Sequence, residues 1–303
     1  MAKDGRTLGN GTPYEARAAW ILLAPALAAI ALFFALPVLG GLALSLTDFD
    51  LYAVADPTNA RFVGLGNYTR LLGDPVFWKA LGNTLLFVGL GAPLTLLASL
   101  GGALLVHSRL ARLRGIWRTV FFAPVVTTLV AAAVVFRYLY HPRYGLLNRG
   151  LDLLGLPAVD WLGDPRWALL AIVLMSLWRS FGYGLVILVA GLAAIPDSLY
   201  EAARIDGAGW WRQLTSITLP MLSPTLLFVT VLTTVGLFQV FAEPYVMTRG
   251  GPLNGTLSVA LFMYQQGFRW WNLGQAAAIA FVLFALILAA SAVPAALGRR
   301  RSG

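Results

Sequence analysis

Cysteine is absent from the 303-residue sequence, and histidine occurs only at His107 and His141. Disulfides and thiolate metal sites are therefore excluded, and two isolated histidines do not suggest a metal centre. Charged residues are also scarce, at 12% of the chain, whereas apolar residues make up 59% and the mean hydropathy is +0.76. A soluble domain of this length carries about twice that share of charges. The sequence therefore indicates an integral membrane protein without metal or redox chemistry of its own.

Long apolar segments dominate the chain. A bilayer core about 30 Å thick needs about 20 apolar residues in a helix. Six segments meet this requirement, at roughly Ala18–Ser45, Ala80–Val106, Trp117–Tyr140, Trp167–Leu192, Leu222–Met247 and Gly274–Leu297. The first is longer than the apolar region of a secretory signal, so we expect it to be retained. We predict an all-α polytopic membrane protein with a six-helix transmembrane domain over residues 18–297.

Basic residues set the expected orientation. Residues 1–17, 107–118, 196–221 and 298–303 together carry twelve basic and five acidic side chains, a net of +7. The other connections, at about 46–79, 141–166 and 248–273, carry eight basic and seven acidic ones, a net of +1. The positive-inside rule predicts that the first set is cytoplasmic, including an N-terminal segment 1–17 and a basic tail 298–303. These charges orient the protein, and we expect no nucleic-acid partner.

A polar insert, residues 196–221, separates the fourth and fifth spans, and we call it the elbow. Ser198-Leu-Tyr-Glu201 has the pattern of a capping box, which predicts a short helix starting there. Gly207 can end that helix in the left-handed conformation. A second amphipathic helix is expected from Trp210 until Pro220 stops it. These features alone are equally consistent with an interfacial helix and with a docking element.

The spacing within the elbow resembles a known signature. Glu201-Ala202-Ala203, then Gly207, Ile217 and Leu219-Pro220 reproduce the EAA motif of permease subunits of binding-protein-dependent ABC importers. Further stretches resemble the carbohydrate-uptake branch, in particular the compact six-helix form of the maltose-permease type: Gly191–Asp197, Asp206–Ala208, Gly64–Tyr68, Asn83-Thr84 and Tyr245–Pro252. The resemblance extends over nearly the whole chain.

The resemblance implies a heteromeric importer in a prokaryotic cytoplasmic (inner) membrane. Its expected partners are a second homologous permease subunit, two ATP-binding subunits, an extracytoplasmic solute-binding protein and membrane lipid. The chain has no GxxxxGK[ST] phosphate loop, so ATP and Mg are expected on the ATP-binding subunits and no cofactor or enzymatic activity in this chain. The elbow would be the coupling helix, and its expected ATPase-coupling residues are Glu201, Ala202, Ala203, Asp206, Gly207, Ile217, Leu219 and Pro220.

The solute path is expected along the fourth and fifth spans, as the resemblance implies. Ionisable residues inside a span are costly and indicate function, which points to Arg179 and Glu243. Ser176, Ser180 and Tyr183 share one helical face. Hydroxyls, amides and aromatic rings suit sugars. The candidate path residues are Ser176, Trp178, Arg179, Ser180, Tyr183, Thr234, Phe238, Gln239 and Glu243.

Each of these residues also has a purely structural interpretation. Serine and threonine in spans bond to their own helix backbone, and Arg179 could form an internal ion pair or contact the second permease. Arg179 would equally suit a phosphorylated solute such as glycerol phosphate. An ion-coupled secondary transporter, with Glu243 as its intramembrane carboxylate, is the alternative function, and a membrane enzyme lacks any clustered catalytic group.

Overall fold

The computed structural model describes residues 13–107 and 114–299, and within them the chain is helical with only an isolated bridge between Thr47 and Phe62. The all-α prediction is therefore confirmed. The α-helices are α1 (Pro13–Ile30), α2 (Leu36–Ser45), α3 (Leu51–Ala55), α4 (Gly66–Leu72), α5 (Pro75–His107), α6 (Arg114–Val126), α7 (Leu129–Leu139), α8 (Leu146–Leu153), α9 (Pro165–Ala193), α10 (Asp197–Ile205), α11 (Trp210–Gln213), α12 (Leu219–Phe238), α13 (Ala242–Met247), α14 (Val259–Tyr264) and α15 (Leu273–Arg299). Three π-helical turns interrupt the series, at Ala31–Ala35, Leu214–Thr218 and Gln265–Arg269.

Five helical stretches in the described residues are long and apolar enough to cross a membrane, and a bent pair brings the number to six. Four of them agree closely with the predicted first, second, fourth and sixth spans. The N-terminal segment 1–17 and the tail 298–303 lie largely outside the described residues, as do residues 108–113 of the basic loop. The six-span prediction thus corresponds to the structure when the bent pair counts as one span.

The third predicted span, Trp117–Tyr140, is not a continuous helix. α6 and α7 meet at an angle of 97°. The Thr127 hydroxyl donates to the carbonyl oxygen of Pro124 at 2.6 Å, and Thr128 is extended with φ −65° and ψ 136°. The Thr127 amide donates to the same carbonyl oxygen at 3.3 Å, so the last turn of α6 closes with bonds three residues apart and the chain then becomes extended. The segment predicted as the third span is thus two helices in the structure.

The fifth predicted span also differs from the structure at both ends. Pro220 does not stop the preceding helix. The π-turn ends with the Leu219 amide donating to the carbonyl oxygen of Leu214. Pro220 then lies in the first turn of α12, a position where proline is tolerated although it has no backbone N–H to donate. At the other end α12 closes at Phe238, and Glu243 lies in the separate short helix α13.

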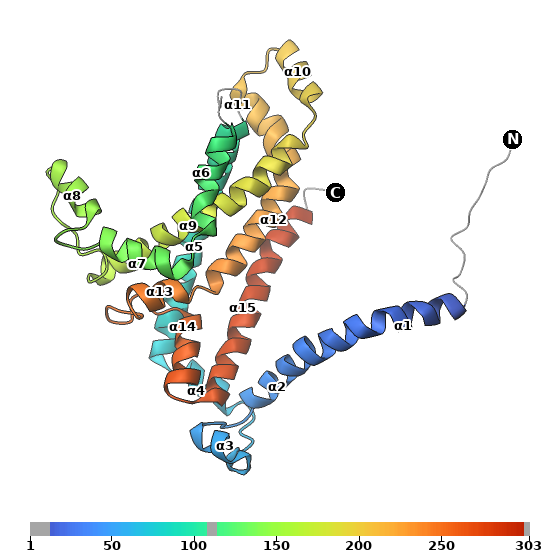
Figure 1. The fold of residues 1–303 in the computed structure, drawn as a ribbon, viewed down its shortest axis with the longest axis vertical. Coiled ribbons are helices and arrows are strands. Elements are labelled where there is room, and N and C mark those ends of the chain that lie inside the picture. Colours follow the sequence, from blue (N-terminus) through green and yellow to red (C-terminus); the bar gives the residue numbers. More distant parts are fainter. Residues whose placement is uncertain (1–12, 108–113, 300–303) are drawn as a thin grey trace.

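The centre of the bundle is α9, which packs against α5, α6 and α12. Figure 1 shows α5, α12 and α15 running alongside one another, with α10 and α11 at the opposite end from α3 and α4. Small residues permit the close crossings. A Cβ added at Gly182 of α9 would overlap the carbonyl oxygen of Phe121 in α6. The approach of these two helices therefore requires glycine at this position.

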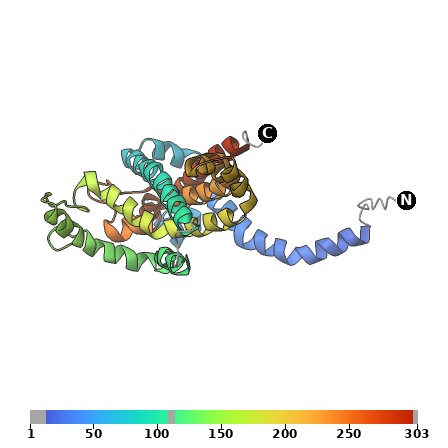
Figure 2. The same cartoon turned by 90° about the horizontal axis from the view of Figure 1, so that it is seen from above.

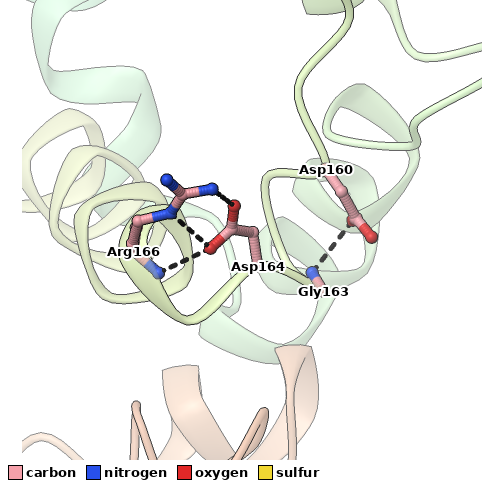
Figure 3. Close-up of polar contacts among 4 residues, drawn as sticks. All are labelled: Asp160, Gly163, Asp164 and Arg166. Atoms are coloured by element: carbon pink, nitrogen blue, oxygen red, sulfur yellow. Dashed lines mark hydrogen bonds and ion pairs between the residues drawn. The ribbon is translucent and has the colours of Figure 1, made fainter.

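The start of α9 is defined by its own polar residues. The Asp164 carboxylate caps the helix by accepting from the Arg166 amide at 2.9 Å, and it also pairs with the Arg166 guanidinium at 2.8 Å (Figure 3). Hydrogen bonds from Arg166 hold the pKa of Asp164 below its ordinary value. Just before it, the Asp160 carboxylate accepts from the Gly163 amide at 2.9 Å. These turns set the point at which the most buried span begins.

The connection after α13 is anchored to the second span by two neighbouring side chains. The Asn83 amide of α5 donates to the carbonyl oxygens of Asn254 and Leu257 at 2.7 and 3.0 Å. The Thr84 hydroxyl accepts from the Val259 amide at 3.0 Å. Both side chains are buried, so a backbone turn far along the chain is tied to the bundle core.

The first half of the first span, α1, leaves the bundle, whereas its second half, α2, packs against α15. Figures 1 and 2 both show α1 extending away from the other helices, and the most apolar 18-residue window of Ala19–Ser45 has no buried residue. Its exposed side chains include Leu22 and Phe33, at 79% and 78% exposure. A helix this apolar needs either lipid or another chain around it.

Candidate functional site

The elbow forms two short helices joined by a glycine turn. α10 ends at Ile205, Gly207 adopts a φ of +73°, and α11 begins at Trp210. The first helix, the place of the turn and the start at Trp210 agree with the prediction, but the second helix continues through the π-turn into α12 instead of ending at Pro220. The capping box does not form, because α10 begins one residue before Ser198 and its N-cap, Pro196, offers no side-chain acceptor.

The predicted coupling residues fall into two groups. Glu201, Ala202, Asp206 and Gly207 are exposed on the free side of the elbow, and Ala203 is half-buried beside them. Ile217 and Leu219 are half-buried and Pro220 is exposed at the start of α12, where Ile217 packs against a buried cluster of α5, α9 and α12. The first group offers a surface, whereas Ile217 connects that surface to the spans. Ile205, at 87% exposure, adds an apolar side chain to the surface that the sequence analysis did not single out.

Side-chain hydrogen bonds fix the elbow to the base of the fifth span. The hydroxyls of Tyr200 in α10 and Thr218 in the π-turn lie 3.0 Å apart. The Gln213 amide donates to the carbonyl oxygen of Ala208 at 2.7 Å, which closes the turn. Tyr200 also packs on the same buried cluster as Ile217. Side-chain contacts therefore hold the elbow against the cluster formed by α5, α9 and α12.

A cavity of about 340 Å³ lies between the spans, and α6, α9, α12 and α13 supply its lining. Its polar lining residues are Ser176, Arg179, Ser180, Tyr183, Thr233 and Glu243. The apolar lining includes Val125 from α6 and Val229 and Leu232 from α12. This volume lies in the range of small-molecule sites, which are mostly apolar with a few polar groups.

Two helices meet through polar groups in this cavity. The Ser176 hydroxyl of α9 donates to the Glu243 carboxylate of α13 over a long 3.4 Å. The Ser180 hydroxyl instead donates to the carbonyl oxygen of Ser176 at 2.7 Å, the local bond expected for serine in a span. It keeps its oxygen lone pairs free to accept from a solute.

Four of the predicted path residues do not line the cavity. Trp178 packs on Phe136 with ring centroids 5.2 Å apart. Thr234 and Phe238 are buried elsewhere, at 8% and 3% exposure, and Gln239 is exposed at the end of α12. The structure thus brings together the α9 residues and Glu243, but it turns a different face of α12 toward them.

The sequence analysis missed Thr233 and Gly236 on that face of α12. Thr233 and Gly236 lie on the same helical face as Val229. If any one of the three had been known to line the cavity, the helical spacing would have predicted the other two. Nothing in the sequence supplied that first residue, because α12 is apolar on all sides.

Comparison with known proteins identifies the family. Residues 95–303, more than two thirds of the chain, match the family described as the binding-protein-dependent transport system inner membrane component. The chain belongs to this family. Its members are membrane components of transport systems, which agrees with a multi-pass chain carrying a cavity and an exposed elbow.

Relatives extend over almost the full length. The lactose transport system permease protein LacF of Rhizobium radiobacter is 36% identical over 273 residues, covering 88% of this chain and 89% of LacF. The trehalose/maltose transport system permease protein MalF of Thermococcus litoralis is 36% identical over 290 residues, covering 95% of each chain. A bacterial alginate ABC transporter in complex with an alginate-bound periplasmic protein contains a chain of the same fold, with a TM-score of 0.80 at 21% identity over 95% of this chain and 96% of that one.

Proposed function

We propose that this chain is the permease subunit of an ATP-driven, solute-binding-protein-dependent importer for a sugar or sugar-like solute. The observation that carries the proposal is the pairing of two features in one chain. A cavity with several polar lining groups lies between the fourth and fifth spans, and an exposed EAA elbow is hydrogen-bonded to the base of the fifth span. The names of the relatives, which include lactose and trehalose/maltose permeases, support the sugar class.

The cavity chemistry suits a polyhydroxyl solute. The cavity is lined by hydroxyl-bearing side chains, those of Ser176, Ser180, Tyr183 and Thr233. Tyr183 is 53% exposed and also offers its aromatic ring. Sugar hydroxyls pair with such donors and acceptors, and an aromatic face accommodates the apolar face of a pyranose. The family places this chain in a membrane, where the solute must shed water to cross, so these groups replace the lost hydration.

The elbow serves in this proposal as the coupling helix for an ATP-binding subunit. Glu201, Asp206 and Gly207 present polar groups and a tight turn, and Ile205 provides an apolar contact. The two ATP-binding subunits would carry ATP and Mg, because this chain has no phosphate loop. The charge distribution supports a cytoplasmic position for the elbow and both termini in this proposal.

A second permease subunit completes the path in this proposal. Support comes from the first span, in which α1 projects from the bundle and the most apolar 18-residue window has no buried residue. Packing on a second permease would cover it. The extracytoplasmic binding protein would deliver solute to the opposite face, as the family description implies for its members. The relatives reported above give no support to the ion-coupled alternative.

The test is reconstitution. Co-expression with the candidate second permease, ATP-binding subunits and binding protein is followed by a screen of mono-, di- and oligosaccharides for stimulation of ATP hydrolysis. We expect one sugar class to stimulate hydrolysis only when the binding protein is present. If no ATP-binding subunit co-purifies with this chain, or if uptake persists without ATP and collapses with the proton gradient, the proposal is wrong.

A further inference from the structure

Two opposite charges from different helices line the same cavity. Arg179 stands on α9 and is half-buried, whereas Glu243 stands on α13 and is 8% exposed. A charge at such a depth is costly unless an opposite charge or hydrogen bonds compensate it. Opposite charges that line one cavity attract each other across it. The remaining polar lining residues of the cavity, Ser176, Ser180, Tyr183 and Thr233, carry hydroxyls and no charge.

The two charges line one cavity without forming an ion pair. Among the described residues, no nitrogen–oxygen contact of 4.0 Å or less links Arg179 to Glu243. The helix geometry explains the arrangement, because Ser176 and Arg179 are three residues apart on one face of α9 and Ser176 already contacts the carboxylate. Space for a solute thus adjoins a guanidinium, which only donates hydrogen bonds, and a carboxylate, which only accepts them.

We propose that Glu243 neutralises Arg179 and thereby makes the cavity selective for uncharged polyhydroxyl solutes over phosphorylated, sulfated or carboxylated ones. A sugar hydroxyl can accept from Arg179 and donate to Glu243, so both residues are satisfied by one neutral ligand. An anionic group offers acceptors alone and is repelled by the carboxylate. Glu243 is therefore a specificity-determining residue. This inference rests on the proposed function for the identity of the cavity, but not on ATP coupling.

The experiment measures an anion in the cavity directly. Radiolabelled sulfate is titrated into the purified importer complex in detergent, at constant ionic strength, without the binding protein and without ATP. The variants are Glu243→Gln, Arg179→Gln, the double replacement, and Glu243→Asp, which keeps the charge. We expect Glu243→Gln to gain one sulfate site per copy of this chain, with affinity roughly tenfold or more above that of the unaltered complex. The double variant and Glu243→Asp should lack the site.

Two results of the sulfate titration would overturn the inference. One is sulfate binding in the unaltered complex that Arg179→Gln abolishes, because Arg179 would then be free to take an anion. The other is a monodisperse Glu243→Gln complex that binds no more sulfate than the double variant. The comparison of the unaltered complex with Arg179→Gln does not depend on whether the Glu243 variants assemble. Sulfate binding requires no transport. A negative result of the sulfate titration can therefore be distinguished from a failure of the reconstituted importer to respond to sugars. An anionic sugar as the stimulating solute of the unaltered importer would also refute the selectivity.

Discussion

Replacing Gly207 with alanine tests the elbow most sharply. Gly207 has a φ of +73°, and an added Cβ would meet nothing within 4 Å. The replacement therefore creates backbone strain without a clash inside this chain, and a left-handed residue with a side chain costs about 1–2 kcal/mol. A penalty of that size lowers the population of the native turn by roughly 5–30-fold. Gly209 is the matched control, because its φ is −67° and its Cβ would also stand in open space.

The assay is binding-protein-stimulated ATP hydrolysis together with solute uptake in proteoliposomes. We expect Gly207→Ala to reduce both by up to roughly 5–30-fold, while Gly209→Ala stays close to the unaltered importer. Gly207→Arg should abolish transport with membrane insertion intact, because the bulky charged side chain adds a steric and electrostatic barrier at the docking surface. Equal activities of Gly207→Ala, Gly207→Arg and the unaltered importer would refute the assignment of this turn as the coupling contact.

Three further replacements test the cavity, the bundle and the tie between elbow and spans. Arg179→Ala should weaken apparent solute affinity in uptake assays, whereas Gln239→Ala should not, because Gln239 does not line the cavity. Gly182→Ala should lower the unfolding temperature in detergent, since overpacking against backbone costs about 1–3 kcal/mol, while Gly89→Ala, with open space at its Cβ, should not. Tyr200→Phe should reduce the amount of solute moved per ATP, because it removes the hydroxyl that bonds to the base of α12.

Their contrary outcomes are equally specific. Unchanged uptake kinetics in both Arg179→Ala and Gln239→Ala would remove Arg179 from the path. Equal unfolding temperatures for the two glycine variants would contradict the close crossing of α6 and α9. A matched control for Tyr200 is Thr215→Ala, which removes only a local bond to the carbonyl oxygen of Trp211. If Tyr200→Phe and Thr215→Ala move the same amount of solute per ATP, the hydrogen bond between Tyr200 and Thr218 does not transmit motion.

Sequence patterns predicted most of the spans because a bilayer imposes a length and an apolar composition on every crossing helix. The breaks within the third and fifth spans were not predictable in this way. The Thr127 hydroxyl bonds to the carbonyl oxygen of Pro124 where α6 ends, but a threonine in a span can equally bond within a continuous helix, as Thr230 does to Leu226. Tertiary packing decides between the two, and no local pattern records it.

The candidate site shows the same division. Ser176, Ser180 and Tyr183 reach one cavity as their helical spacing predicted, and their role as solute contacts stays a prediction. On α12 the predicted Thr234 is buried away from the cavity, and Thr233 takes its place. The rotation of an evenly apolar helix about its axis depends on its neighbours, so one residue of error in register moves a side chain to another face.

Binding-protein-dependent ATP hydrolysis by the reconstituted importer, with the unaltered chain and with Gly207→Arg, tests the central claim most directly. The account predicts that a sugar-loaded binding protein stimulates hydrolysis in the first complex and not in the second, although both contain this chain in the membrane. Sugar uptake that proceeds without ATP-binding subunits, or stimulation that is indifferent to Gly207, would contradict it.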